Sequence, residues 1–421
     1  MRERLGAAVE LLRRNRNFRR YAVGRTASVL GTTTAPAGLA FALIDQDGGG
    51  TAIGVVATAS MLVFLTVTPG AGVLADRLPR VWIIVTCQLV CGVSQCVSAA
   101  LFLSGSATVW SLGGLAVLTA AAGAFFAPAA KGLIAGIVEP GALVPANALL
   151  QIAGNLVAIA GPTIAGLVIA SVSPGWVLGW DGVTYLLSGA VFRMVRVPAA
   201  AVRPERRGFA RELIEGLSAF AGRRWLWTLT GLQALTSACW GAGFTVLGPL
   251  YAARHLEGGA VGWGIVGSAL GVGLAIGSVT ALTLAPVRVG LLLCATALPE
   301  ALLLAGMAAA APTWWIAAVG ALTGVAGTLQ LISYTSLQQR EIPQEQLSRV
   351  LATSSVAGGV LVPLFSAFAG PLADAVGVRV VLAGCAAVVV AGAAAAFSVR
   401  DVRRLRSTAG PASGRRSHPY C

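Results

Sequence analysis

The chain has 421 residues, of which 56% are hydrophobic and only 11% are charged, and its formal net charge is +14. An ordinary soluble domain carries charge on about a quarter of its residues, so this composition excludes a soluble globular protein and indicates a membrane protein. The seven cysteines are scattered and give no disulfide framework. Cys87 and Cys91 share a helical face and are interpreted as small packing residues rather than metal ligands.

Twelve apolar stretches are long enough to cross a bilayer as helices, because a bilayer core of about 30 Å requires roughly 20 apolar residues per crossing. Their Gly and Ala content and the scarcity of alternating patterns favour helices over a β-barrel. The first stretch is too long for a signal peptide and is kept as the first span. The predicted spans are 21–44, 52–74, 81–103, 109–130, 147–170, 176–197, 225–251, 261–284, 289–309, 313–336, 351–372 and 378–398.

Basic residues are sorted to one side of these spans. Seven arginines precede the first span, eight surround the link between the sixth and seventh spans, and six follow the last one. The opposite set of loops holds only Arg254 and Arg379. This distribution follows the positive-inside rule and predicts that both termini are cytoplasmic. The positive charge is thus a topological signal, with a weak attraction to anionic lipid, and nucleic acid is not expected as a partner.

The two halves of the chain resemble each other in sequence. Gly154 and Gly166 match Gly358 and Gly370 at an offset of 204 residues, and "RNFRRYAVGRT" matches "RRWLWTLTGLQ" at an offset of 207 residues. The prediction is an all-α membrane protein with twelve transmembrane helices in two six-helix repeats. The segments are a cytoplasmic N-terminal segment 1–20, an N-terminal bundle 21–197, a cytoplasmic linker 198–222, a C-terminal bundle 223–398 and a cytoplasmic tail 399–421.

Duplicated halves in a chain with twelve predicted spans indicate a secondary transporter. In such proteins the binding site lies near the bilayer midplane between the halves, and one half rocks against the other to expose it to either side.

The link between the second and third spans carries the motif "GVLADRLPR". This motif resembles the loop signature of the major facilitator superfamily, with Gly72, Asp76, Arg77 and Arg80 at the matching positions and Pro79 in place of the usual Gly. A polar turn at a helix end can act as a cytoplasmic latch: Asp76 can accept hydrogen bonds from a facing helix N-terminus, and the arginines can hold carboxylates or lipid phosphates. The alternative is a solvated loop whose arginines only fix the topology.

A second G-x-L-A-D sequence begins at Gly370, in "GPLADAVGVR". The repeat offset and the charge distribution place it on the outer side of the membrane, so it is not interpreted as this cytoplasmic signature.

The fifth span contains "GNLVAIAGPTIAG", in which Gly161, Pro162 and Gly166 resemble the G-P-x-x-G element of exporters of the same superfamily, especially proton-coupled drug antiporters. Proline kinks the helix and glycine allows a neighbour to press against it and seal a leak path. The alternative is a plain packing kink. The glycines of "GSALGVGLAIGS" are interpreted as helix-packing residues and not as a nucleotide loop.

Few charged residues fall inside the predicted spans. Glu300 lies near the middle of the ninth span, where an ionised carboxylate is costly, so it is a candidate for proton coupling. The resemblance implies that this helix is peripheral, which leaves a bond to local backbone or another chain as the alternative. Arg25 either snorkels to the surface or pairs with a carboxylate as a second coupling candidate. Asp45 and Asp181 are expected near the outer interface.

The resemblance also implies which helices line the substrate cavity. Polar and aromatic side chains at a spacing of four residues share a helical face. They would give a mostly apolar pocket with a few directional groups, suited to lipophilic or aromatic compounds. The candidates are Gln151, Asn155, Gln233, Trp240, Phe244, Gln330 and Tyr334, with Asn147 on the same face of the fifth span.

The favoured function is proton-coupled efflux of a small molecule such as a drug, antibiotic or siderophore across a bacterial inner membrane, by a monomer without cofactor or metal. The stretches "RRNRNFRRYAVGRTASVLG" and "PANALLQIAGNL" are similar to the branch that contains macrolide and enterobactin exporters. A metabolite importer of the same fold is the alternative. A sensor on this fold would need a longer soluble domain, and a polytopic membrane enzyme would need an acid, base or metal cluster, whereas His255 and His418 are the only histidines.

Overall fold

The computed structural model describes residues 10–46, 49–139, 142–196, 222–283 and 288–405. Within these ranges the side chains of residues 69–70, 72–77, 131, 135, 143–145, 148, 282–283, 344–349 and 352 are outside the described part. The described residues form helices and contain no strand, which confirms the predicted all-α membrane fold.

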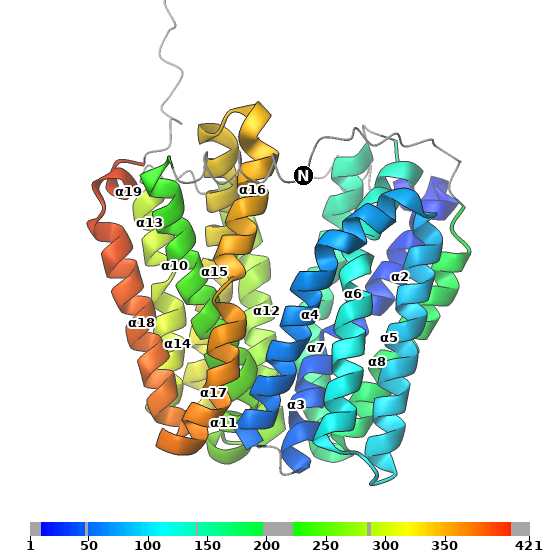
Figure 1. Cartoon of the computed structure of the whole chain (residues 1–421), viewed down its shortest axis with the longest axis horizontal. Coiled ribbons are helices and arrows are strands. Elements are labelled where there is room, and N and C mark those ends of the chain that lie inside the picture. Colours follow the sequence, from blue (N-terminus) through cyan, green and yellow to red (C-terminus); the bar gives the residue numbers. More distant parts are fainter. Residues whose placement is uncertain (1–9, 47–48, 140–141, 197–221, 284–287, 406–421) are drawn as a thin grey trace, which may run out of the picture.

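The helices of the N-terminal half are long and run back and forth (Figure 1). They are α2 (Arg16–Thr32), α3 (Ala35–Asp45), α4 (Gly49–Arg77), α5 (Arg80–Leu103), α6 (Val109–Ile137), α7 (Leu143–Ser171) and α8 (Pro174–Arg193).

The C-terminal half contains more interruptions. Its elements are α10 (Arg224–Trp240), the π-helix η2 (Gly241–Val246), α11 (Leu247–His255), α12 (Gly259–Thr283), α13 (Val289–Ala295), α14 (Leu298–Ala308), α15 (Thr313–Glu341), α16 (Gln344–Gly359), α17 (Val362–Val376), α18 (Val378–Ser398) and α19 (Arg400–Arg404).

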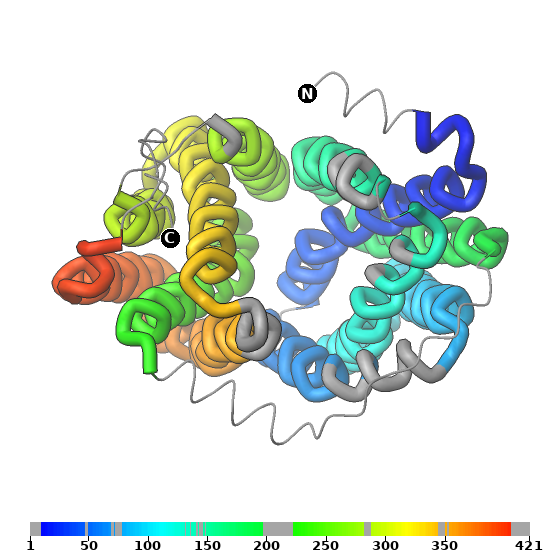
Figure 2. Tube along the Cα trace, turned by 90° about the horizontal axis from the view of Figure 1, so that it is seen from above, coloured from blue at the N-terminus to red at the C-terminus, as the bar shows by residue number. Residues whose placement is uncertain are grey.

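The two halves lie side by side and meet along few helices. Seen from above, α2–α8 gather on one side and α10–α19 on the other (Figure 2). The halves contact each other mainly through α4 with α17 and α7 with α12, and also through α3 with α11. We call the end of the molecule at Arg16 and α19 the termini face, and the end at Asp45 and His255 the far face (Figure 1).

Ten stretches of the described helices are long and apolar enough to cross a membrane. They correspond to ten of the twelve predicted spans. The other two predicted spans, 176–197 and 225–251, coincide with α8 and with α10–η2–α11, which are helical but are not among these ten. The division into two six-helix repeats with a linker at 198–222 stays a prediction.

Several predicted spans are broken inside the bundle. The first one bends between α2 and α3, where the hydroxyls of Thr33 and Thr34 donate to the carbonyls of Leu30 and Gly31 (3.0 and 2.7 Å). Pro36 lies in the first turn of α3, directly after the bend, and has no N–H to continue the helical ladder. Pro299 and Pro363 stand in the same way in the first turns of α14 and α17.

Glycine packs the helices across the interface between α7 and α12. A Cβ on Gly267 of α12 would lie 2.6 Å from Cβ of Pro162, and one on Gly271 would lie 2.6 Å from the carbonyl oxygen of Ala158. Because Pro162 cannot donate to the carbonyl four residues earlier, this oxygen is free to face the glycine of the neighbouring helix. The interpretation of the α12 glycines as packing residues is confirmed.

Candidate functional site

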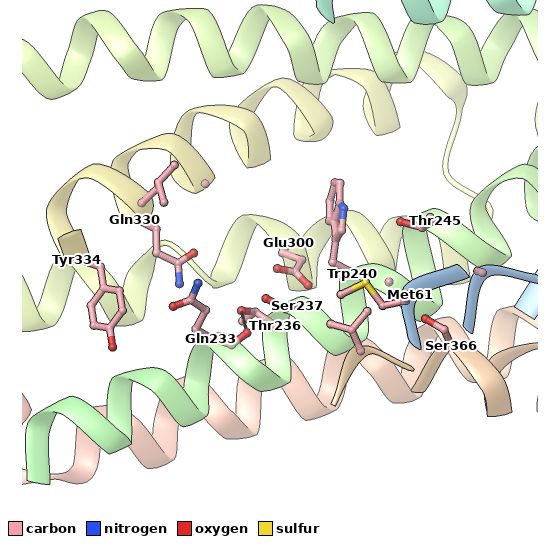
Figure 3. A pocket seen from close by; sticks show the side chains of 15 residues that line it. Met61, Gln233, Thr236, Ser237, Trp240, Thr245, Glu300, Gln330, Tyr334 and Ser366 are labelled. Atoms are coloured by element: carbon pink, nitrogen blue, oxygen red, sulfur yellow. Dashed lines mark hydrogen bonds between the residues drawn. The ribbon is translucent and has the colours of Figure 1, made fainter. Parts of the chain in front are cut away.

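A cavity of about 460 Å³ lies between the halves. It is bounded by α10 and η2, α14, α15 and α17 of the C-terminal half and by α4 of the N-terminal half. Ten of its lining residues are labelled in Figure 3. The full lining consists of Ala57, Met61, Gln233, Thr236, Ser237, Trp240, Gly241, Thr245, Glu300, Gly327, Gln330, Leu331, Tyr334, Val362 and Ser366.

One end of the cavity is polar. Gln233 of α10 and Gln330 of α15 point toward each other there (Figure 3). Nearby, the hydroxyl of Tyr334 lies 2.6 Å from Oγ1 of Thr230, which fixes the ring, and both residues are buried. Amides and a hydroxyl on two facing helices provide directional hydrogen bonds in an otherwise apolar space.

The aromatic wall of the cavity is Trp240. Its ring stacks on that of Phe244, with centroids 4.2 Å apart and planes 14° from parallel. Phe244 in turn contacts Trp263 of α12 at 4.6 Å. Phe244, predicted to line the cavity, instead supports Trp240 from behind, because the π-helix that begins at Gly241 shifts the register of the helical face.

Glu300 lines the same cavity and carries its only carboxylate among the described residues (Figure 3). It stands in the first turn of α14, after the break at α13, and its Oε1 is buried without a hydrogen-bond partner among the described residues. The resemblance implied that this helix is peripheral and does not line the cavity, but the side chain of Glu300 does line it. Its candidacy for proton coupling stays a prediction.

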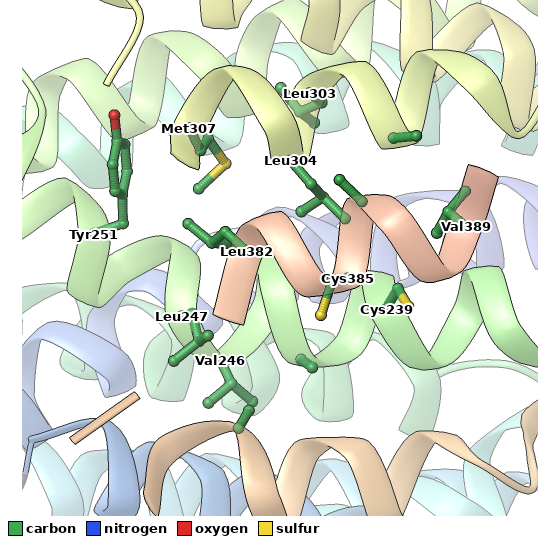
Figure 4. Packing of buried hydrophobic residues seen from close by; sticks show 14 of the residues in the cluster. Cys239, Val246, Leu247, Tyr251, Leu303, Leu304, Met307, Leu382, Cys385 and Val389 are labelled. Carbon is green, nitrogen blue, oxygen red and sulfur yellow. The ribbon is translucent and has the colours of Figure 1, made fainter. Parts of the chain in front are cut away.

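A packed apolar cluster joins α10, η2 and α11 to α14 and α18 (Figure 4). Leu304 of α14 and Leu382 of α18 are fully buried in it, close to Gly243 of η2. A Cβ on Gly243 would lie 2.6 Å from Leu304, so a glycine is needed for α14 to approach this closely.

Gln151 and Asn155 do not line this cavity. The side-chain amide of Gln151 donates to Oδ1 of Asn155 at 3.0 Å on the exposed face of α7. Their predicted shared face is correct, but α4, and not α7, supplies the N-terminal half of this cavity, through Ala57 and Met61.

The loop motif is more helical than expected. Residues 72–77 form the last turns of α4, and only Leu78 and Pro79 separate it from α5. Arg80 donates from Nη1 to the carbonyl oxygen of Gly132 on α6 at 2.8 Å, a main-chain group of the same half. The side chains of Asp76 and Arg77 lie outside the described part, as do the surroundings of Gly72. The latch therefore stays a prediction.

The exporter-like motif of α7 touches both halves. A Cβ on Gly161 would meet the side chain of Thr33 at the bend of the first span, and one on Gly166 would meet the carbonyl of Ala260 of α12. Next to Pro162, the hydroxyl of Thr163 lies 2.6 Å from that of Ser268 on α12. The motif therefore packs against a bend on one side and against the opposite half on the other.

Arg25 contacts an aromatic ring of the same half, and its role as a coupling candidate stays a prediction. Its guanidinium lies 5.0 Å from the ring centroid of Phe126 on α6 and is half-buried. A cation–π contact of this kind is a structural partner for an arginine inside a bundle.

Asp181 was not expected inside the protein. It lies two turns into α8, is only 1% exposed, and accepts a hydrogen bond from Nε2 of Gln95 at 2.5 Å. Its position near the outer interface stays a prediction, whereas its burial between helices was not predicted. The signal in the sequence was the pair Gln88 and Gln95, seven residues apart on one face of α5.

The arrangement of two helical halves around a cavity with an aromatic wall and one carboxylate defines a polytopic membrane transporter of the alternating-access class. Residues 22–362 match the family profile of the Major Facilitator Superfamily, and the chain belongs to this family.

Two curated relatives have names that describe transport. The chain is 29% identical over 301 residues, 66% of this chain and 69% of the relative, to an uncharacterized MFS-type transporter, y4rN, of Sinorhizobium fredii. It is 26% identical over 385 residues, 86% of this chain and 88% of the relative, to the multidrug efflux pump Tap of Mycobacterium tuberculosis.

Solved structures share the fold at low sequence identity. A POT family transporter in complex with 5-aminolevulinic acid superposes with a TM-score of 0.73 at 10% identity, covering 91% of this chain and 96% of that one. The nucleoside transporter NupG gives a TM-score of 0.71 at 13% identity, covering 91% and 98%. These similarities show the fold alone.

Proposed function

We propose that this protein is a bacterial inner-membrane exporter that uses the proton gradient to expel a small lipophilic or aromatic compound. The chain acts as a monomer with both termini in the cytoplasm, so the termini face is the inner face and the far face is the outer one.

The observation that carries the proposal is Glu300 in the central cavity. A carboxylate without a hydrogen-bond partner for Oε1, in a membrane-embedded space, is costly when ionised. The cost is removed when the group binds a proton or faces a polar or cationic part of the cargo. One site that accepts either a proton or a cargo molecule exchanges one for the other, which is the requirement of an antiporter.

The rest of the cavity fits a cargo with an aromatic or lipophilic body. Trp240 offers a flat, rigid face, and Met61 of the opposite half is a flexible apolar side chain that adapts to different shapes. Gln233, Gln330 and Tyr334 provide a small set of polar contacts at one end. The similarity to a multidrug efflux pump supports export of such compounds.

The transport cycle follows from where the halves meet. In this structure α4 packs on α17 and α3 on α11 near the far face. With the termini in the cytoplasm, this is an inward-facing arrangement. Cargo enters the cavity from the inside, the halves rock, and a proton arriving at Glu300 from the outside displaces the cargo.

Everted membrane vesicles that contain the protein test this function. After respiration has acidified their interior, we expect an aromatic or lipophilic compound from a panel to accumulate inside and to release part of the proton gradient when it is added. Vesicles without the protein and vesicles treated with a protonophore are the controls. Compound movement in the opposite direction would identify an importer, and compound-independent proton movement would contradict the coupling.

A further inference from the structure

The helices α4 and α17 touch backbone to backbone near the far face. A Cβ on Gly370 of α17 would collide with the main chain of Gly50 and would lie 2.5 Å from Cα of Thr51. One turn deeper, a Cβ on Gly54 would lie 2.7 Å from the carbonyl oxygen of Ser366. The main chains of α4 and α17 therefore touch here, and the side chains of Leu250 and Val246 pack beside this contact.

Two side-chain hydrogen bonds join the described residues of α4 and α17. Deeper in the bundle, Oγ1 of Thr58 donates to the carbonyl oxygen of Pro363 at 3.2 Å, and the other bond lies at the far face. Oγ1 of Thr51 donates to Oδ2 of Asp374 at 2.6 Å, and both groups are exposed. Thr51 lies in the first turn of α4 and Asp374 in the last turn of α17. A carboxylate beside a helix N-terminus is favoured by the unpaired N–H groups and the helix dipole, and Asp374 lies beside the first turn of α4.

The residues around Asp374 repeat a pattern that occurs at the other end of α4. Gly370, Leu372, Ala373 and Asp374 have the same spacing as Gly72, Leu74, Ala75 and Asp76. Each aspartate lies near the C-terminal end of its own helix, and the two helices pack together in opposite directions. The two halves of this fold are parallel repeats and each contains an inverted repeat, so together they relate the inner end of a helix in one half to the outer end of a helix in the other.

We propose that Gly370–Asp374 is an outer gate that closes on Gly50 and Thr51, and that Asp374 is the positioning residue that holds it shut. This inference rests on the alternating-access function proposed above and extends it to the closing of the outer face. In the inward-facing state the Thr51–Asp374 bond and the glycine contact seal the cavity from outside. When the protein turns outward, both contacts separate.

Labelling of Ser366→Cys measures this gate without any transport. Ser366 lines the cavity, is 4% exposed and lies directly behind the glycine contact. In intact cells we expect a membrane-impermeant maleimide to label this cysteine slowly. Adding Asp374→Ala or Thr51→Val removes the bond and is expected to speed labelling by roughly tenfold, the size of effect that loss of a hydrogen bond to a charged group produces. Asp374→Asn keeps an acceptor and should label slowly.

The matched control is Asp45→Ala, which removes another carboxylate at the far face, at the end of α3. It should leave the labelling rate unchanged, and the chain without an added cysteine corrects for its own thiols. Equal labelling rates in Asp374→Ala, Thr51→Val and Asp45→Ala would overturn the gate. Two independent variants of the bond protect the test against a single misfolded protein.

A crosslink provides the second arm. Cysteines at positions 51 and 374, joined by a short bifunctional thiol reagent, should hold the halves together after cleavage at a protease site placed in the linker. The crosslinked protein should stop exporting, and reduction should restore export. Export by the crosslinked protein would contradict the gate. If Asp374→Ala speeds labelling of Ser366→Cys but the protein exports no compound of the panel, only the proposed function would be contradicted.

Discussion

Glu300 combines three properties that are rarely found together inside a membrane bundle. It is acidic, its Oε1 has no hydrogen-bond partner among the described residues, and it faces a cavity whose opposite wall belongs to the other half of the molecule. Asp181 is also acidic, and its Oδ1 is likewise buried without a hydrogen-bond partner among the described residues, but it does not line the cavity. The position therefore suits a group that changes partner during the cycle.

Replacing Glu300 by Gln keeps the size and the hydrogen-bonding capacity of the side chain but removes the proton-binding site. We expect uphill efflux to fall by at least about tenfold, equivalent to about 1.4 kcal/mol, while downhill cargo exchange across vesicles continues. Glu257→Gln, in the link between α11 and α12, is the matched control and should behave as wild type. Gradient-dependent efflux that survives in Glu300→Gln would remove this residue from the coupling step.

Asp181 is a second buried acid with a different environment. Its Oδ2 is bonded to Gln95, and the Gln88 amide donates to Ser188 at 2.5 Å in the same layer between α5 and α8. We expect Asp181→Asn to retain the thermal stability of the protein in detergent, because Asn still accepts the bond from Gln95. Asp181→Leu should lower the free energy of unfolding by about 1–3 kcal/mol, since it leaves a buried amide unsatisfied. Equal melting temperatures for the Asn and Leu variants would exclude this role.

The residues of the cavity differ in how far the sequence could reveal them. Gln233, Trp240, Gln330 and Tyr334 were proposed because the family resemblance implies which helices line the cavity, and helical periodicity adds only that Gln330 and Tyr334 share a face. The position of Glu300 in the cavity wall depends on the break between α13 and α14. The position of Phe244 outside the cavity lining depends on the π-helix η2. Both are consequences of tertiary packing, which a local pattern does not encode.

At the scale of elements, the interface between α7 and α12 is a close main-chain contact around Pro162. We expect Gly271→Ala to impair transport and to lower thermal stability, because its methyl group would lie 2.6 Å from the carbonyl oxygen of Ala158. Gly154→Ala on α7 is the matched control, since a Cβ there would meet no atom within 4 Å. A Gly271→Ala protein with normal transport and stability would show that this contact loosens without consequence.

The elements themselves followed well from the sequence, because length and hydrophobicity identify helices that cross a bilayer. The link between the predicted second and third spans, residues 75–80, was too long, since α4 continues to Arg77 before Pro79 interrupts the ladder. The bend at Thr33 and Thr34 was not predicted, because it is stabilised by hydroxyl groups that bond to main-chain carbonyls and by contact with Gly161.

At the scale of the whole molecule, the distribution of arginines predicts the orientation in the membrane. The cysteine of a Glu257→Cys variant, at the far face, should react with an impermeant maleimide in intact cells. The cysteine of an Asp401→Cys variant, in α19 at the termini face, should react only after the membrane is permeabilised. The opposite pattern of labelling would reverse the orientation and, with it, the direction of the proposed cycle.

The contact of Gly50 with Gly370 has a consequence for the speed of the cycle. Interlocked side chains must change rotamer before two helices can separate, and each such rearrangement adds to the activation barrier. Where the main chains of α4 and α17 touch, the helices part without this step, so their separation is limited by the Thr51–Asp374 and Thr58–Pro363 bonds and by the entry of water. A seal of this kind excludes small ions when shut, yet it requires little activation energy to open.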